Sequence, residues 1–508
     1  MNASVCEEFR LNSVDFRSLK DFGSLDTKKV ALISLGCPKN LVDSEVMLGL
    51  LQKGGYELTS DEQEADILII NTCAFIESAK QESINTIIEF GDRANHQKIV
   101  VTGCLAQRYS DELAEALPEV SAFVGTGEFH KIVSVCDLLM EGARGQEGTG
   151  ASKKQEKPRS LILVSSPQYL YDHLTPRVVS TPKHYAYLKI AEGCDNVCSF
   201  CTIPQLRGVH RSRSLDSLLA EAYHLAELGV RELVLISQDS TSYGVDLTGK
   251  QQLPKLLKKL TLIDGIEWIR VLYAYPTLVD EELLETMMTE KKVCKYLDIP
   301  IQHIHDDILR RMIRKTTSAQ LRAKIALIKH KAPDITLRST VIIGFPGETE
   351  EHFKTMLDFI KEVEFDHLGV FAYSREEGTP AARMKEQLPE EVKQERVEKL
   401  VEIQKKIAFQ KRQSYIGKET IVLLDGFDEN SCVTYARTEG QAPEIDDIVY
   451  ISSPIESRLS WMPRFSGGVS PTEVGHPAAY SGKISIGEFV SVRIVGTYEY
   501  DFVGEVLI

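Results

Sequence analysis

The chain has 508 residues, which is too long for one ordinary hydrophobic core and predicts about three domains. Hydrophobic residues make up 43% and charged residues 26%, which excludes a disordered chain, and no apolar run approaches the roughly 20 residues of a membrane-spanning helix. The formal net charge of −15 disfavours nonspecific binding to nucleic acid, because neutralising phosphates requires a surplus of Lys and Arg.

The first third of the chain predicts an open parallel sheet. Residues 1–27 form a charged leader without an apolar signal core, so we expect a cytoplasmic protein and assign the leader no role. Residues 28–141 then contain β-rich runs at 30–36, 65–72, 98–103 and 120–125, separated by amphipathic stretches. This alternation predicts right-handed βαβ units. Residues 142–179, which begin with a Gly-rich charged stretch without periodicity, predict a linker.

The middle of the chain, residues 180–410, predicts a partial (β/α)6 barrel. Six β-rich runs alternate with helical patterns at 186–193, 232–237, 268–273, 296–300, 338–344 and 367–373. Chemistry in such a barrel is expected on the loops that follow the strands. A long charged helix is predicted from Pro389 to Tyr415.

Residues 411–508 contain several short β-rich runs, which predict a small antiparallel β domain. A stretch rich in Ser, Pro and Gly near 452–482 predicts a loop inserted into it. The fold class is therefore α/β, with an N-terminal sheet domain, a partial barrel and a C-terminal β module.

Three cysteines follow the first strand of the predicted barrel at close spacing. Ten cysteines in a chain of this length do not indicate a disulfide scaffold, so clustered ones favour metal binding or catalysis. Cys194, Cys198 and Cys201 can hold three irons of a cubane cluster and leave the fourth iron open for a chelating ligand. The alternative is a zinc knuckle, although no second Cys-x-x-Cys pair supplies the ligands of a closed zinc site.

A second cysteine triad is predicted from topology. Cys37, Cys73 and Cys104 each follow the end of a predicted parallel strand directly or within a residue. The carboxyl ends of neighbouring strands share one edge of a sheet, so we expect these thiols to meet there and hold a second cluster. The alternative is three buried cysteines that act as small apolar residues. The remaining four cysteines are expected to be structural or incidental: Cys6, Cys136, Cys294 and Cys432.

The CxxxCxxC motif at 194–201, with the aromatic Phe200 before its last cysteine, resembles the radical S-adenosylmethionine superfamily over about residues 185–375. That resemblance implies a 4Fe-4S cluster whose open iron chelates S-adenosylmethionine and cleaves it to methionine and a 5′-deoxyadenosyl radical. Together with the three-cysteine domain and the β module, called TRAM, the chain resembles the methylthiotransferases over nearly its full length. This family implies a second 4Fe-4S cluster that takes part in supplying sulfur, a second S-adenosylmethionine as methyl donor, and an electron donor such as a flavodoxin or ferredoxin.

Local motifs resemble the RimO branch of this family, which implies modification of the β-carbon of an aspartate in the basic small-subunit ribosomal protein S-twelve. The motifs are SLGCPKNLVDSE (34–45), KIAEGCDNVCSFCTIPQLRGVHRSR (189–213), ISQDSTSYGVDL (236–247), YAYPT (273–277), LDIPIQH (297–303), IIGFPGETEEHF (342–353) and FAYSREEGTPAA (371–382).

Charge provides an independent argument about the substrate. Residues 416–508 hold 14 Asp and Glu against 6 Lys and Arg, a net charge of −8, whereas a module that grips RNA should be basic. An acidic surface suits a basic protein, and the alternative is a solvated acidic face. Two other functions stay open: a transfer RNA adenosine methylthiotransferase, and a noncatalytic iron–sulfur scaffold or electron carrier.

The resemblance also implies a set of S-adenosylmethionine contacts, which are Phe200, Gln238, Asp239, Arg338, Ser339, Gly344 and Gly347. The alternatives are that Gly344 and Gly347 are turn glycines and that Arg338 pairs with a structural carboxylate. His303 and His305 are interpreted as polar loop residues and not as metal ligands. No general base is required, because a radical removes the hydrogen atom.

Overall fold

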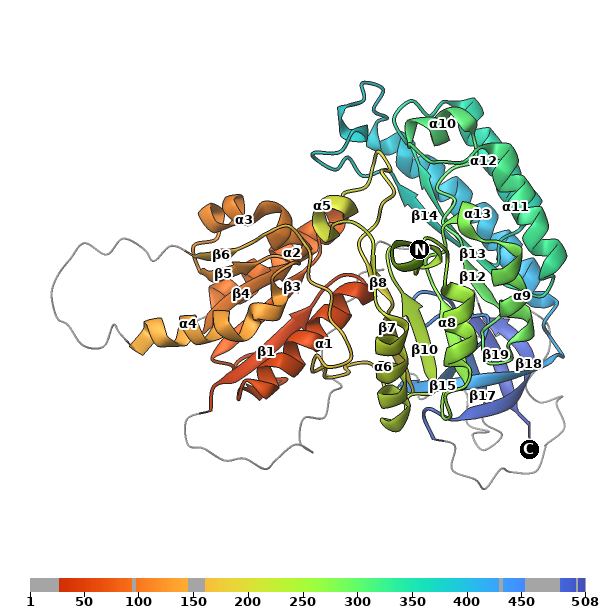
Figure 1. Cartoon of the computed structure of the whole chain (residues 1–508). Coiled ribbons are helices and arrows are strands. Elements are labelled where there is room, and N and C mark those ends of the chain that lie inside the picture. Colours follow the sequence, from red (N-terminus) through yellow and green to blue (C-terminus); the bar gives the residue numbers. More distant parts are fainter. Residues whose placement is uncertain are drawn as a thin grey trace.

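The computed structural model describes residues 27–93, 97–144, 160–428, 433–452, 485–498 and 501–507. They form an N-terminal sheet lobe and a larger lobe that contains a partial barrel and a small closed β barrel (Figure 1). Most of the predicted leader, residues 145–159 of the predicted linker, and nearly all of the predicted insertion lie outside the described residues, as do Cys6 and Cys432. No helix in the described ranges is long and apolar enough to cross a membrane.

The N-terminal lobe is a six-stranded parallel sheet in the order β2-β1-β3-β4-β5-β6. Its strands are β1 (Lys29–Ser34), β2 (Glu57–Leu58), β3 (Ile67–Thr72), β4 (Lys98–Gly103), β5 (Val120–Val124) and β6 (Leu161–Leu163). Its helices are α1 (Pro38–Lys53), α2 (Glu77–Arg93), α3 (Cys104–Ala116) and α4 (Ile132–Arg144). Every residue of β3 is buried, which explains its continuous apolar run between two helical layers.

The predicted parallel sheet is therefore confirmed, with two strands that the sequence pattern missed. Strands β2 and β6 contain two and three residues, which is too short to show a period. Strand β6 lies in the range that the sequence analysis assigned to a linker, and it pairs with β5 through Ala122, Phe123 and Val124.

The central domain consists of six parallel strands in two three-stranded groups, β11-β10-β7 and β12-β13-β14. The strands are β7 (Tyr185–Lys189), β10 (Glu232–Ile236), β11 (Trp268–Val271), β12 (Tyr296–Asp298), β13 (Thr336–Ile343) and β14 (His367–Ala372). A parallel bridge between Ile269 and Val293 connects the groups, so the predicted partial barrel is confirmed. The covering helices include α6 (Leu215–Glu227), α8 (Leu253–Leu260), α9 (Glu281–Thr289), α11 (Ser318–Lys331), α12 (Glu350–Val363) and α13 (Glu390–Gln413).

The C-terminal module is a closed barrel in the order β15-β16-β17-β19-β18. Its strands are β15 (Glu419–Asp428), β16 (Val433–Thr438), β17 (Val449–Ser452), β18 (Phe489–Tyr498) and β19 (Asp501–Val506). Four pairings are antiparallel, as predicted, but β17 and β19 pair in parallel. This pairing closes the barrel and leaves no open strand edge.

Several acidic residues of the C-terminal barrel lie in its interface with the partial barrel. The Glu444 carboxylate accepts hydrogen bonds from the hydroxyls of Tyr185 and Tyr187, at 2.6 and 2.8 Å. Asp446 accepts one from Tyr296 at 2.7 Å. The Asp425 carboxylate forms a hydrogen bond with His184, and the Asp447 carboxylate accepts one from Arg412. Part of the acidic surplus therefore stabilises the molecule itself, so the net charge of this module is a weaker argument for a basic partner than the sequence indicates.

Candidate functional site

The first cysteine triad lies on the loop that follows β8 (Ala191–Glu192) at the carboxyl end of the partial barrel, and its three side chains are partly exposed. The loop begins at Gly193 with φ +83°, where an added Cβ would lie 2.0 Å from the Val209 carbonyl oxygen. The Ser199 hydroxyl donates a hydrogen bond to the Arg311 carbonyl at 2.7 Å. The backbone N–H and the side-chain amide of Asn196 both donate to the Cys194 Sγ at 3.5 Å. The loop is therefore held from both sides of the barrel mouth.

The environment of this triad opposes ionisation of the Cys194 and Cys201 thiols. Burial raises the pKa of Cys201 to about 12, and the neighbouring Cys198 and Cys194 add to the rise. Burial also raises the pKa of Cys194. Because iron is bound by thiolates, a bound metal centre would supply the positive charge that these thiolates need.

The second cysteine triad lies at one edge of the N-terminal sheet. Cys37 follows β1 and precedes α1, Cys73 follows β3 directly, and Cys104 follows β4 directly and begins α3. Neighbouring strand ends are in register, with Thr72 opposite Gly103. An added Cβ on Gly36 would lie 2.8 Å from the Cys73 Cβ, so the loop that carries Cys37 passes directly over Cys73. The three thiols thus gather from three separate strand ends.

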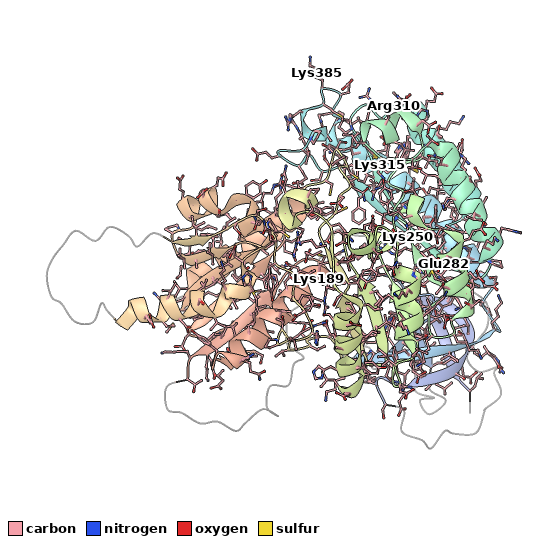
Figure 2. All side chains as sticks on the ribbon, in the orientation of Figure 1. Lys189, Lys250, Glu282, Arg310, Lys315 and Lys385 are labelled. Carbon is pink, nitrogen blue, oxygen red and sulfur yellow. The ribbon has the colours of Figure 1, made fainter. Side chains whose placement is uncertain are left out.

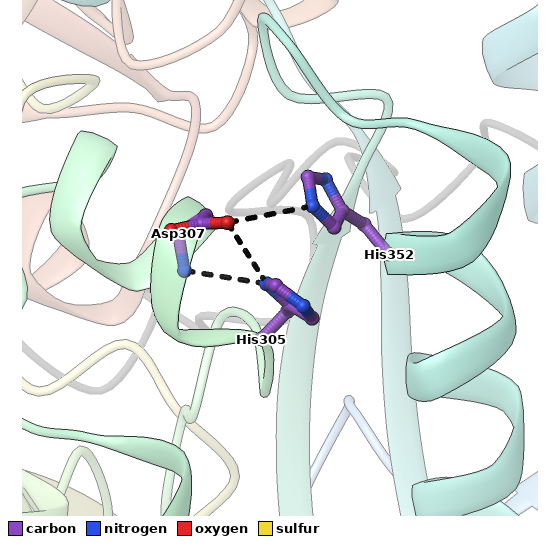
Figure 3. Close-up of side chains that lie close together, drawn as sticks. All are labelled: His305, Asp307 and His352. Atoms are coloured by element: carbon purple, nitrogen blue, oxygen red, sulfur yellow. Dashed lines mark hydrogen bonds and ion pairs between the residues drawn. The ribbon is translucent and has the colours of Figure 1, made fainter.

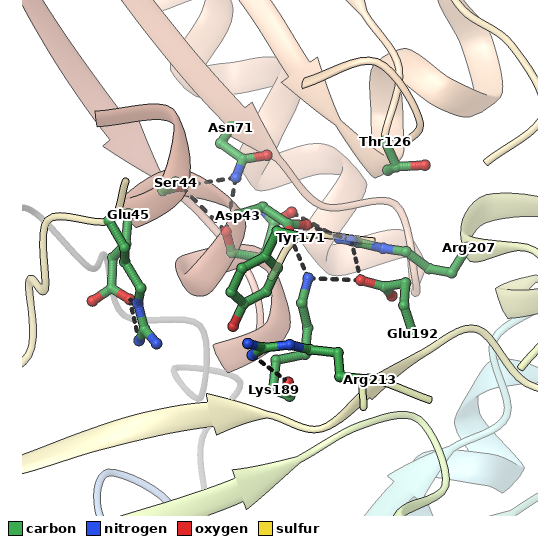
Figure 4. Close-up of polar contacts among 12 residues, drawn as sticks. Asp43, Ser44, Glu45, Asn71, Thr126, Tyr171, Lys189, Glu192, Arg207 and Arg213 are labelled. Atoms are coloured by element: carbon green, nitrogen blue, oxygen red, sulfur yellow. Dashed lines mark hydrogen bonds and ion pairs between the residues drawn. The ribbon is translucent and has the colours of Figure 1, made fainter. Parts of the chain in front are cut away.

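A buried network of charged side chains crosses between the two lobes (Figure 4). Lys189, at the end of β7, donates to Asp43 of α1 at 2.5 Å and to Glu192 at 2.7 Å. Arg207 also donates to Asp43, and its other terminal nitrogen donates to the Cys104 Sγ at 3.5 Å. Figure 2 shows Lys189 between the two lobes.

None of these four charged residues is among the site residues predicted from the sequence. Asp43 lies six positions after Cys37, Glu192 two before Cys194, and Arg207 six after Cys201. Proximity to predicted ligands, together with charge in otherwise apolar strands, is the signal that points to these residues. Attraction to Lys189 and Arg207 overcomes the effect of burial and lowers the pKa of Glu192 to about 2.

Two predicted cofactor contacts lie beside the first triad. The Gln238 amide nitrogen donates to Glu192 at 2.6 Å, whereas its oxygen is buried and has no partner in the described part of the chain. Asp239 accepts hydrogen bonds from Asn196, Thr241 and Ser242. Asp239 thus fixes the cysteine loop, and the Gln238 oxygen remains an acceptor for a ligand.

The other predicted cofactor contacts are occupied by structural interactions. Arg338 pairs with Asp298 at 3.2 Å and with Asp446 at 3.3 Å, which is the alternative that the sequence left open. The Ser339 hydroxyl donates to the Ile299 carbonyl at 2.7 Å. Phe200 packs edge-on against Phe345, with ring centroids 6.3 Å apart.

The two predicted glycines both adopt the left-handed conformation. Gly344 has φ +75° and lies against Lys393, and Gly347 has φ +84° and lies against Arg311. Both glycines are required by the turn that follows β13. The structure thus brings Gln238 and Asp239 to the first triad and gives the remaining predicted contacts structural partners.

His305, Asp307 and His352 form the one group of three side chains in the described residues whose ligand atoms lie close enough together for a single metal ion, within 4.8 Å of one another (Figure 3). The Nδ1 atom of His305 accepts the backbone N–H of Asp307 at 3.2 Å, and that of His352 accepts the backbone N–H of Thr349 at 3.2 Å. A neutral imidazole that accepts at Nδ1 carries its proton on Nε2. Metal-bound imidazoles donate from the second nitrogen instead, so these histidines are helix caps.

The donor chemistry of the two cysteine triads fits iron–sulfur clusters. Each triad offers three soft sulfur ligands and no fourth cysteine among the described residues, which suits three irons of a cubane. The unpartnered Gln238 oxygen beside the first triad suits a polar ligand such as S-adenosylmethionine.

Comparison with known protein families divides the chain into three matches. Residues 29–125 match the uncharacterized protein family UPF0004, residues 188–360 match the radical SAM superfamily, and residues 416–507 match the TRAM domain. The triads fall in the first and second of these matches.

Several curated relatives are similar over nearly the full length. The ribosomal protein uS12 methylthiotransferase RimO of Geobacter sulfurreducens is 46% identical over 94% of this chain and 99% of its own length. The protein of the same name from Clostridioides difficile is 45% identical over 94% of this chain and 99% of its own length. Among solved structures, the radical S-adenosylmethionine methyltransferase TsrM of Kitasatospora setae aligns with a TM-score of 0.50 at 16% identity, over 70% of this chain and 77% of that chain.

Proposed function

The chain belongs to the RimO family of ribosomal protein uS12 methylthiotransferases, and we propose that it attaches a methylthio group to the β-carbon of an aspartate of uS12 by radical S-adenosylmethionine chemistry. The observation that carries the proposal is the pair of cysteine triads, one in each lobe, with a buried charged network between the lobes that reaches the Cys104 sulfur. The family uses S-adenosylmethionine and 4Fe-4S clusters.

In this proposal Cys194, Cys198 and Cys201 hold the radical cluster, and Cys37, Cys73 and Cys104 hold the auxiliary cluster. When bound, the radical cluster and S-adenosylmethionine supply a 5′-deoxyadenosyl radical, and the auxiliary cluster takes part in supplying sulfur. The protein holds these groups in place and keeps competing hydrogen donors away from them.

The residues around the first triad have distinct tasks. Asn196 donates to the Cys194 sulfur, and Asp239 holds the Asn196 side chain at 3.2 Å. Arg314 donates to the Cys198 sulfur at 3.8 Å, and its guanidinium lies over the Tyr275 ring at 4.3 Å. Gln238 offers its free oxygen to S-adenosylmethionine. These hydrogen bonds to the sulfurs orient the cysteine side chains for binding a cluster.

The electron and the substrate reach the site from outside. Val197, on the cysteine loop, is 59% exposed, which leaves that loop open to a reduced flavodoxin or ferredoxin. The substrate is a ribosomal protein, so we expect the reaction to take place in the cytoplasm. Nucleic acid as a substrate is disfavoured by the family, and the transfer RNA alternative has no supporting feature in this chain.

The deciding experiment compares cells with and without this chain by mass spectrometry of uS12 and of transfer RNA. Loss of the methylthio group from uS12 alone is the expected result. Loss from transfer RNA with uS12 unchanged would reverse the substrate assignment. In parallel, the anaerobically reconstituted, reduced enzyme should convert S-adenosylmethionine to 5′-deoxyadenosine, and failure to do so would leave only an iron–sulfur scaffold.

A further inference from the structure

Arg207 lies at the point where the two lobes meet. It is the last residue of the short helix α5 (Ile203–Arg207), which begins two residues after Cys201. Its side chain nevertheless enters the N-terminal lobe, where it is 3% exposed and donates to the Cys104 Sγ at 3.5 Å. The Thr126 hydroxyl of that lobe donates to the Leu206 carbonyl and anchors α5 there. The radical domain thus supplies a cation to the auxiliary triad.

The guanidinium of Arg207 is fixed by partners on each terminal nitrogen. One nitrogen donates to Asp43 and lies 3.6 Å from Glu192, and the other donates to Asn40 at 3.1 Å and to Cys104. Only the planar fork of arginine matches this set of acceptors. A buried charge without such partners destabilises the folded protein. The arrangement therefore indicates that the contact between Arg207 and the Cys104 sulfur is a fixed feature of the folded protein.

The charges of Arg207 and of the charged side chains around it sum to zero without any contribution from the cysteine thiolates. Lys189 and Arg207 supply two positive charges, and Asp43 and Glu192 supply two negative charges. The contact to Cys104 is therefore not needed to neutralise the acids. The contact instead affects the cluster that Cys104 would hold. Hydrogen bonds to cluster sulfurs and nearby positive charge both favour the reduced, more negative state of a cluster.

We propose that Arg207 is a positioning residue that raises the reduction potential of the auxiliary cluster through its hydrogen bond to the Cys104 sulfur. This inference rests on the proposed function, because it requires a cluster at the second triad. Because Arg207 belongs to the radical domain, the reduction potential of the auxiliary cluster would depend on how the two lobes dock.

The test is a redox titration of the full-length holoenzyme, followed by electron paramagnetic resonance. The signal that changes when S-adenosylmethionine is added is assigned to the radical cluster, and the other to the auxiliary cluster. In Arg207→Gln the auxiliary midpoint should move to lower potential, by a shift of the order of a tenfold change in the reduced-to-oxidised ratio, about 59 mV for one electron. The radical midpoint should stay where it is, because the hydrogen bond of Arg207 to sulfur goes to Cys104 of the other triad.

Two further variants separate tuning from a loss of structure. Arg207→Lys keeps the charge but not the fork, and should give a smaller shift in the same direction. The double variant Arg207→Gln with Asp43→Asn removes one charge of each sign, so it keeps the network balanced if the single variant does not fold. It should restore part of the midpoint shift, which a purely structural role for Arg207 would not do.

Arg211→Gln is the matched control. Arg211 lies four residues after Arg207, and it donates to the backbone carbonyls of Pro167, Val209 and Arg207 and not to a cysteine sulfur, so it tests the loss of a neighbouring guanidinium without a sulfur contact. An auxiliary midpoint that is equal in wild type, Arg207→Gln and Arg211→Gln would overturn the inference. A wild-type enzyme with iron for only one cluster would instead overturn the proposed function, so the two failures are distinguishable.

Discussion

The two cysteine triads are built in different ways. The first lies within eight residues on one loop, is partly exposed, and is held by the contacts of Asn196 and Ser199. The second gathers residues from three strand ends, and Cys73 and Cys104 are buried. A single loop specifies the first site, whereas the topology of a whole sheet specifies the second.

This difference has a consequence for how each site is coupled to the rest of the molecule. The first triad lies on a loop at the carboxyl end of the partial barrel, where S-adenosylmethionine needs access. The second triad is covered by the radical domain through Arg207, so its environment depends on the interface between the lobes. Variants that remove one triad at a time are the strongest way to break the comparison.

The largest effect is expected for Cys201→Ala. Loss of this ligand should abolish formation of 5′-deoxyadenosine, because a radical cluster with two protein ligands is not retained in a reactive form. The auxiliary triad shares no residue with the loop and should keep its iron. Chromatographic assay of 5′-deoxyadenosine and iron analysis check both statements. Cys136→Ala is the control, because Cys136 is buried in the core of the N-terminal lobe. Loss of all iron in Cys201→Ala would show that the sites are not independent.

The reciprocal variant, Cys73→Ala, should uncouple the two half-reactions. Conversion of S-adenosylmethionine to 5′-deoxyadenosine should persist, since the first triad is intact, while methylthiolation of uS12 should fall to background. Mass spectrometry of uS12 after incubation measures the second reaction. Cys294→Ala, another buried thiol, serves as control. If Cys73→Ala kept full methylthiolation, the second triad would not take part in sulfur transfer.

A third prediction concerns the docking of the lobes. The buried Glu45 carboxylate of α1 accepts two hydrogen bonds from Arg177, at 2.9 and 2.6 Å, and two from Ser180, at 2.6 and 2.8 Å. Glu45→Ala leaves a buried guanidinium short of a partner and should lower the free energy of unfolding by about 3–5 kcal/mol. Anaerobic denaturant titration of the holoenzyme measures this loss.

The matched control for the docking prediction is Glu402→Ala. Glu402 forms an exposed ion pair with Lys406 on α13, and such pairs contribute little. Equal midpoints for Glu45→Ala and Glu402→Ala would show that the interface does not stabilise the native fold.

The sequence pattern predicts the sheets well because burial on both faces produces continuous apolar runs such as residues 67–70. It does not predict the partners of charged residues in those strands. Lys189 ends the fully buried strand β7, and its partner Asp43 lies in another lobe, 146 positions away in sequence. Such pairs depend on how domains dock, and periodicity within one element contains no information about docking.

The motifs that carry the family resemblance contain the residues of the charged network, although the sequence did not indicate that these residues contact one another. Asn40, Asp43 and Glu45 lie in the motif at 34–45, and Lys189 and Arg207 lie in the motif at 189–213. The structure shows that these two motifs form opposite sides of one interface. A strand position alone does not tell whether Arg338 contacts a ligand. The structure shows its ion pairs with Asp298 and Asp446, and its contact with S-adenosylmethionine stays a prediction.

The smallest effect is expected for His352. Its group with His305 and Asp307 is compact, but we expect it to bind no metal, in contrast to the two cysteine triads. Its Nδ1 accepts a backbone N–H, so only the neutral ring keeps the cap of α12. Burial and the nearby His305 and His303 lower its pKa, so the unfolded chain gains a proton near pH 6.5 before the folded protein does. The stability that this group contributes is therefore complete above about pH 6.5 and falls as the pH drops below it.

Nitrogen-detected imidazole spectra should show the Nε2–H form of His352, unchanged by added Zn²⁺, and the variant His352→Gln identifies its signal. An Nδ1–H form, or stoichiometric zinc retention lost in Asp307→Asn, would make this group a third metal site beside the two cysteine triads.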